Sequence, residues 1–186
     1  IPYGDCTGAQ LNDTNLSGMN LTGINFRRAD LTNAHLDNAE LDDADFQYAD
    51  LTNADFQDSN LTNATFQYTD LINAEFEHAN LTNADFSGAD LTGANLEDAI
   101  IPNADFRNAI IIRAEFYESD ITNGDFRNAD LSYSSLHDTL ATNSNFRSAD
   151  LTNTDLSGST FNNASFWNAD LTNADLVISN LIGADL

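Results

Sequence analysis

The chain has 186 residues, with 30 acidic residues against 6 arginines and no lysine, so its net charge is −24. Such an acidic surface excludes direct binding of nucleic acid and of anionic membranes, because both need basic side chains. Cys6 is the single cysteine and no apolar run is long enough to span a bilayer, so an intramolecular disulfide and a transmembrane segment are excluded as well.

A five-residue repeat runs without a break from Leu11 to Leu186. A bulky Leu, Ile or Phe occupies 35 of its 36 positions, and Ala141 is the exception. Two places before each bulky position lies a small residue, which is Ala in 23 cases. A period of five fits neither a helix, which repeats at about 3.6 residues, nor a strand, which repeats at two. The pattern predicts one continuous array, and hence a single domain over residues 1–186.

A second period, of twenty residues, sorts the bulky positions by type. Phenylalanine fills every twentieth position from Phe26 to Phe166. In another column the small Ala141 comes before the large Phe161. Like residues stack on like only if residue n lies beside residue n+20, so the chain is predicted to turn four corners per coil. This gives about nine coils and a rod roughly 43 Å long, at about 4.8 Å per coil.

The repeat unit, as in Ala49-Asp50-Leu51-Thr52-Asn53, resembles that of the pentapeptide repeat family, which is especially abundant in cyanobacteria. The resemblance covers the whole chain. It implies an all-β fold, a right-handed quadrilateral β-helix, in which the bulky and the small residue point inward and the other three point outward. Asn, Asp and Gly dominate the second place after each bulky residue, and these types tolerate the positive φ of tight turns. Ser134, Ser144 and Ser159 fill the small position and are expected to be core spacers.

At the N-terminal end, Met19 and Ile24 stand where Ala is usual, so the first coils are expected to be broader inside. Residues Ile1–Tyr3 and Cys6 are expected to close this end. Cys6 falls in the inward column and is therefore interpreted as an inert, buried thiol.

Twenty of the 30 acids come directly before an inward position of the repeat, with Asp5 before Cys6 and the other 19 before a bulky residue. One column of them forms an acidic face, which consists of Asp30, Asp50, Asp70, Asp90, Asp130, Asp150 and Asp170. In one interpretation these acids are solvated parts of the repeat that keep the rod soluble. A metal ladder is disfavoured, because one carboxylate per coil gives no oxygen cage, and no metal site is expected. In a third interpretation the acids mimic DNA, whose one charge per about 1.7 Å would place about 25 charges on a rod of about 43 Å.

Near the middle of the chain, outward positions hold apolar residues. These are Ile100, Ile110 and Ile112, with Ile72 and Leu140 in the same columns. Either they are scattered exposed residues, which are ordinary, or they form a lateral contact site.

One basic strip interrupts the acidic surface. Arg107, Arg127 and Arg147 occupy successive coils directly after stacked phenylalanines, and Trp167 continues their column. We call these four residues the arginine strip. Its arginines either compensate nearby acids or form a docking strip for an anionic or peptide partner, with Trp167 as the anchor.

The last coil carries exposed apolar residues. Its C-terminal patch consists of Val177, Ile178, Leu181, Ile182 and Leu186. This patch is either a homodimer contact or is covered by residues beyond Leu186.

No catalytic constellation is recognisable, since His35, His78 and His137 lie singly at outward positions. The sequence therefore predicts a rod-shaped protein-interaction or scaffold module with an unidentified partner, without enzymatic activity or a cofactor. A structural rod that spaces other components is a weaker alternative. A further alternative, implied by the resemblance, is an acidic DNA mimic that binds a nucleic-acid enzyme such as DNA gyrase. The chain lacks the loops that interrupt the coil in gyrase-protecting family members.

A soluble protein is expected, with the cytoplasm favoured over the periplasm or thylakoid lumen and the compartment otherwise open.

Overall fold

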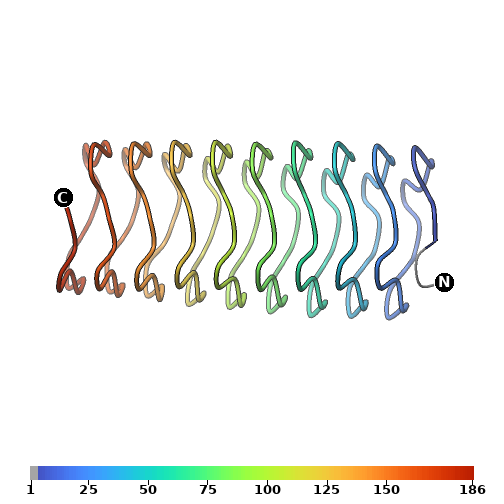
Figure 1. Cartoon of the computed structure of the whole chain (residues 1–186), viewed down its shortest axis with the longest axis horizontal. Coiled ribbons are helices and arrows are strands. Elements are labelled where there is room, and N and C mark those ends of the chain that lie inside the picture. Colours follow the sequence, from blue (N-terminus) through green and yellow to red (C-terminus); the bar gives the residue numbers. More distant parts are fainter. Residues whose placement is uncertain (1–3) are drawn as a thin grey trace.

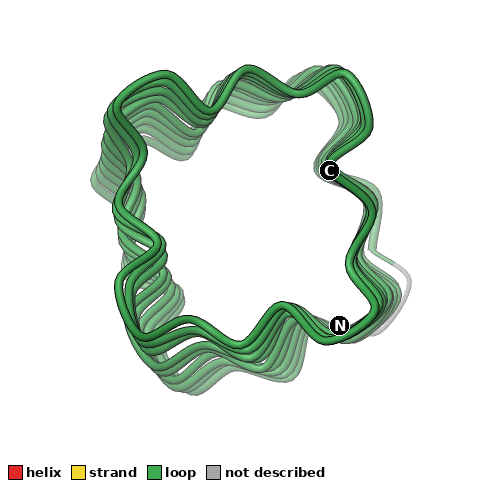
Figure 2. Cartoon of the chain, turned by 90° about the vertical axis from the view of Figure 1, so that its left-hand side faces the viewer, coloured by secondary structure: helices red, strands yellow, loops and turns green. Residues whose placement is uncertain are grey.

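The computed structural model describes residues 4–186 as a stack of similar coils that forms a straight rod, with the two ends of the chain at opposite ends of the rod (Figure 1). The described part contains no helix and no extended strand, and hence no helix that could cross a membrane. Instead, single-residue parallel bridges join residue n to residue n+20, from Asp5–Asn25 to Ser165–Asp185. Viewed along the rod, each coil has four sides, as the period of twenty predicts (Figure 2).

Each pentapeptide ends in a tight turn at a corner of the coil. The N–H of the fourth turn residue donates to the carbonyl of the first, as from Ala34 to Leu31 at 2.9 Å. The third turn residue has a positive φ, as in Asn33 with φ 56°. These are the features of a type II turn, which favours Gly or Asn at that place. The turn signal read from the sequence is therefore confirmed.

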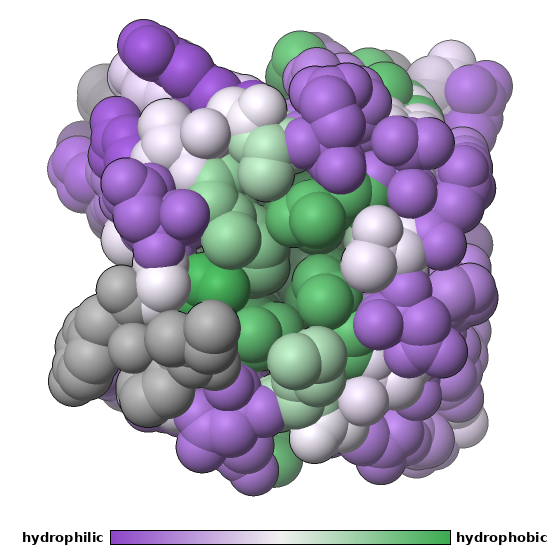
Figure 3. All heavy atoms as spheres, turned by 90° about the vertical axis from the view of Figure 1, so that its right-hand side faces the viewer, coloured by the Kyte–Doolittle hydropathy of each residue, from purple (hydrophilic) through white to green (hydrophobic). Residues whose placement is uncertain are grey.

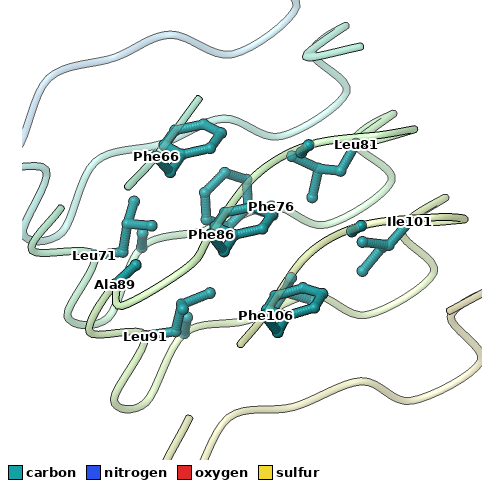
Figure 4. Close-up of a cluster of buried hydrophobic side chains, with 14 of the residues drawn as sticks. Phe66, Leu71, Phe76, Leu81, Phe86, Ala89, Leu91, Ile101 and Phe106 are labelled. Carbon is teal, nitrogen blue, oxygen red and sulfur yellow. The ribbon is translucent and has the colours of Figure 1, made fainter. Parts of the chain in front are cut away.

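Phenylalanine stacks form the centre of the rod (Figure 4). From Phe26 to Phe166, successive rings of the column lie 4.6–5.4 Å apart and nearly parallel. Phe56, Phe76 and Phe116 meet this column edge-on from the opposite side of the coil, at 5.7–6.4 Å. Parallel and edge-on ring pairs both stabilise a core beyond their buried area. The inward direction of the bulky residues is confirmed.

The small inward positions lie between the coils, and their alanines are almost completely buried over most of the rod. At four of the six places where Ser replaces Ala, the hydroxyl donates to a carbonyl of the preceding coil, whereas Ser59 donates within its own turn and the buried hydroxyl of Ser119 has no partner in the described part of the rod. Ser144 donates to Ile121 at 2.8 Å, and Ser134 to Ile111 at 3.1 Å. Ser134, Ser144 and Ser159 are therefore core spacers, as predicted, and their hydroxyl groups are also satisfied.

The N-terminal end of the described rod is hollow and apolar (Figure 3). A cavity of about 280 Å³ opens there. It is lined by Gly4, Asp5, Cys6, Leu11, Leu16, Met19, Leu21, Ile24 and Phe26. Cys6 is only half-buried, so its interpretation as a buried thiol is wrong. The expected closure by Ile1–Tyr3 lies outside the described residues.

Candidate interaction surfaces

The four corners of the coil carry different side chains. Because residue n lies beside residue n+20, the two outward residues of each turn form a ladder along one corner. One ladder, which we call the cationic corner, comprises residues 27–28, 47–48, 67–68, 87–88, 107–108, 127–128, 147–148 and 167–168. Another, the acidic corner, comprises residues 37–38, 57–58, 77–78, 97–98, 117–118 and 137–138. These two corners are separated by two sides of the coil in either direction and are therefore diagonally opposite (Figure 2).

Charge is segregated between these corners. The cationic corner holds 5 of the 6 arginines and no acid, whereas the acidic corner holds 7 of the 30 acids. The two corners between them consist mostly of Thr and Asn residues. Their asparagines hydrogen-bond to one another from coil to coil, as Asn83 donates to Asn63 at 3.0 Å. The arginine strip predicted from the sequence therefore belongs to a whole cationic edge, which also contains Tyr48 and Tyr68, stacked at 5.5 Å.

Two members of the arginine strip are paired with acids of their own pentapeptide. Arg107 donates to Asp105 through Nε at 2.8 Å and through a terminal nitrogen at 2.5 Å, and Arg127 holds Asp125 in the same way. Burial raises the pKa of Asp105, but the hydrogen bonds and charge of Arg107 outweigh this and hold that pKa below its ordinary value. These contacts support local charge compensation for Arg107 and Arg127.

Arg147 is held differently, because Asn145 stands where the other two pentapeptides have Asp. No carboxylate within residues 4–186 forms an ion pair with Arg147. Its guanidinium instead lies 4.6 Å from the centre of the Trp167 ring in the next coil, and Trp167 is 51% exposed. Arg28 over Tyr48 repeats this arrangement on the same corner, at 5.7 Å. An arginine on an exposed aromatic ring combines charge with apolar area, as binding hot spots do.

The acidic face has a structural role that the sequence did not reveal. Six of its seven aspartates accept a hydrogen bond from the backbone N–H two residues later, as Asp50 does from Thr52 at 3.0 Å. Eight asparagines at the equivalent place make the same bond, among them Asn60 and Asn95. This hydrogen bond therefore uses the Oδ1 atom and does not depend on the charge. Asp70 is the seventh aspartate, and burial together with the charges of Asp50 and Asp90 raises its pKa.

The outward isoleucines do not form one patch. Ile100 and Leu140 lie on one side of the coil with Asp120 bridged between them. Ile110 bridges Asp90 and Asp130 on the opposite side, and Ile72 and Ile112 are half-buried. The alternative of a single lateral contact site is therefore wrong, because residues ten apart face in opposite directions in a coil of twenty.

The C-terminal patch is present as predicted, apart from Leu181, which is half-buried against the core. Val177, Ile182 and Leu186 are mostly exposed, and Ile178 is 85% exposed. Ile178 also has φ 56°, a conformation that β-branched residues rarely adopt.

The carboxylates that lie near the histidines were also not predicted from the sequence. His35 lies beside the acidic corner, where its side chain meets Asp37 and Asp55. The signal for this corner in the sequence is the period of twenty among the turn residues, which is the same period that the bulky residues follow.

The comparisons with known proteins agree with this architecture. Models of the family described as pentapeptide repeats match residues 5–43, 20–58, 59–98, 89–128, 109–147, 125–158 and 149–186. No curated protein sequence matches the chain. Among solved structures, HetL, a pentapeptide repeat protein involved in heterocyst differentiation regulation from the cyanobacterium Nostoc, is 28% identical. The match covers 99% of this chain and 85% of HetL, with a TM-score of 0.43.

QnrB1, a plasmid-mediated fluoroquinolone resistance protein, is 18% identical over 97% of this chain and 89% of its own, with a TM-score of 0.53, so it shares the fold. A pentapeptide repeat protein of the Arabidopsis thaliana thylakoid lumen is 26% identical over 62% of this chain and 70% of its own, with a TM-score of 0.33. The predicted right-handed quadrilateral β-helix is confirmed. The chain belongs to the pentapeptide repeat family.

Proposed function

We propose that this protein is a non-enzymatic rod that binds a partner protein along its cationic corner, with Arg107, Arg127, Arg147 and Trp167 as the contact strip. The observation that carries this proposal is the segregation of charge, which places 5 of 6 arginines and no acid on one edge of a chain of net charge −24. Local compensation alone would scatter the arginines among the acids.

Within the strip, Arg147 and Trp167 are proposed as the anchor. Arg147 has no carboxylate to release, and Trp167 offers an exposed ring against which the guanidinium is already ordered. A partner carboxylate that reaches Arg147 therefore displaces no internal ion pair. Arg107 and Arg127 must first give up Asp105 and Asp125, so they contribute less. The stacked phenylalanine core holds the strip rigid, which limits the conformational entropy that the protein loses on binding.

Charge reversal tests this proposal. The partner captured from native lysate is titrated with the purified wild-type protein and with Arg147→Glu, Trp167→Ala and Arg113→Glu. Arg113 is a matched control, because it also lies over an aromatic ring, Tyr133 at 5.6 Å, but on another corner. Arg147→Glu and Trp167→Ala are expected to weaken binding at least about tenfold, which corresponds to about 1.4 kcal/mol. Equal effects of Arg147→Glu and Arg113→Glu would refute the strip.

A second candidate function is DNA mimicry, and one observation favours it. Since asparagine makes the same turn bond at eight places, the fold does not require aspartate at the position before the bulky residue. The negative charge is therefore not a by-product of the turn. The net charge of −24 is close to the roughly 25 charges of a DNA duplex about 43 Å long. The target would be a nucleic-acid enzyme such as DNA gyrase, and duplex DNA would compete with this protein for it.

We also propose that the C-terminal patch packs against a second copy of the chain. The proposal rests on Ile178, which combines a backbone conformation that β-branched residues rarely adopt with a side chain that is 85% exposed among the described residues. In a dimer, burial of Val177, Ile178, Ile182 and Leu186 would offset that strain.

A further inference from the structure

All three histidines of the chain lie on or beside the acidic corner. His78 and His137 belong to its turns, and His35 is on the side of the coil that leads into it. His35 and His78 meet carboxylates of neighbouring coils. The two ring nitrogens of His78 lie 3.7 Å from carboxylate oxygens of Asp58 and Asp98, one coil to either side.

The group around His35 differs from the other two, because two carboxylates approach from the same side. One ligand atom from each of His35, Asp37 and Asp55 lies within 4.8 Å of the others. The closest approach, between His35 Nδ1 and an oxygen of Asp55, is 3.9 Å. The fold brings the three residues together, since His35 and Asp55 are a bridged pair in adjacent coils and Asp37 follows on the turn.

Hydrogen bonds from outside the group hold both carboxylates in place. Ser17 in the preceding coil donates its hydroxyl to Asp37 at 2.5 Å, and this bond lowers the pKa of Asp37. The N–H of Gln57 donates to Asp55 Oδ1 at 3.1 Å, which leaves Oδ2 facing His35. Carboxylate ligands of metal sites are commonly oriented by such outer hydrogen bonds.

We propose that His35, Asp37 and Asp55 bind a divalent transition-metal ion of the zinc or cobalt type. An imidazole with two carboxylates is a donor set that suits such ions, whereas magnesium and calcium prefer oxygen ligands alone. The imidazole separates this group from the single-column acids, which offer one carboxylate per coil. Water would complete the coordination, because the group is open to solvent. The site lies away from the cationic corner and is independent of the proposed function.

The test is titration of the purified protein with Co²⁺, followed by the visible absorption of the ion, and with Zn²⁺ by calorimetry. Both are carried out in about 150 mM salt, so that diffuse attraction to the acidic rod is screened. The wild type is expected to bind one equivalent ahead of any weaker binding. His35→Gln and Asp55→Asn are expected to weaken that equivalent at least about tenfold.

Asp30→Asn is the matched control. It removes one charge from the same region, and like Asp55→Asn it keeps the oxygen that accepts the turn N–H, here from Thr32 at 3.1 Å. His78→Gln controls for the loss of any imidazole on this corner. Both controls are expected to leave the first equivalent unchanged. If Asp30→Asn weakens binding as much as Asp55→Asn, or if His35→Gln has no effect, the metal is held only as a counterion and the proposal fails.

Discussion

At the scale of single residues, two positions of the pentapeptide follow rules that are visible in the turns. The residue before the bulky one is most often Asp or Asn, whose oxygen accepts the N–H two residues later, as in Asp50 and Asn60. The second residue after the bulky one has a positive φ at every turn, which explains the many Asn and Gly residues there. Residues that break either rule, such as Asp70 and Ile178, are therefore informative.

Asp70→Asn is expected to stabilise the fold in a way that depends on pH. Burial and the charges of Asp50 and Asp90 raise the pKa of Asp70 above 3.8 in the folded state. The folded chain thus holds this proton more tightly than the unfolded chain, and ionisation costs stability once the pH rises above the ordinary pKa. Urea unfolding should show the variant more stable than wild type at about pH 7, with the difference vanishing below about pH 3.8. An equal difference at both pH values would show that charge is not the cause.

Ile178→Asn is expected to have opposite effects on the protomer and on the dimer. Asn tolerates the left-handed conformation that costs Ile about 1 kcal/mol, so thermal unfolding of dilute protein should shift upward. The same change removes an apolar side chain from the proposed contact, so light scattering should show less dimer at high concentration. Asn173→Ser, at another exposed turn of the same coil, is the control. Unchanged dimerisation of Ile178→Asn would contradict the C-terminal contact.

The sequence predicts the inward residues well, because burial follows directly from the period of five. It fails at Cys6, where the position is inward but no described coil lies on its outer side to cover it. The contacts of outward residues are harder to predict. Their neighbours lie in coils twenty residues away in the sequence, and each contact also depends on the rotamer of the side chain. Among the residues that the structure describes, Arg147 lacks an ion pair because residue 145 is Asn, whereas the equivalent residues of the two preceding coils, Asp105 and Asp125, are Asp. The group of His35 with Asp55 depends on rotamers as well as on register.

At the scale of the coil, the stacked phenylalanines link each layer to the next. Phe86 lies between Phe66 and Phe106 at 4.8 Å from each, with the edge of Phe76 against it. Each coil therefore stabilises its two neighbours, which makes the interior of the rod more stable than its ends.

Phe86→Ala is therefore expected to lower the free energy of unfolding by about 3–5 kcal/mol, the range for buried Phe in a core that cannot collapse. Leu176→Ala, in the last coil, should cost clearly less, because Leu176 is only partly buried. Denaturant titration followed by circular dichroism measures both. Equal losses at the two positions would mean that the rod does not gain stability from stacking on both sides.

At the scale of the whole molecule, the dominant property is a charge distribution that is uneven around the rod. Twenty acids lie on the four sides and 7 on the acidic corner, while the diagonally opposite corner has none. Such a rod repels polyanions in general and leaves one edge free of acids. Docking on that edge and mimicry of DNA make opposite demands, since mimicry uses the acidic surface and docking uses the arginines.

Salt and duplex DNA distinguish these two functions. If the partner docks on the cationic corner, its affinity should depend weakly on salt, because few charges take part. Mimicry would give a steep loss of affinity with salt and displacement by duplex DNA, as expected for a protein surface that normally neutralises many phosphates. Surface plasmon resonance at several salt concentrations, with and without competing duplex, gives both readouts.

The most direct test of partner binding along the cationic corner is site-specific photocrosslinking in cells of the source organism. A photoreactive amino acid is placed at Asn168 on that corner, and separately at Asn163, which is also exposed but lies on a neighbouring corner. We predict a discrete protein adduct from position 168 that is absent from position 163 and is lost when Arg147→Glu is added. Adducts of the same protein from both positions, or an adduct from position 168 that survives Arg147→Glu, would contradict docking on the cationic corner.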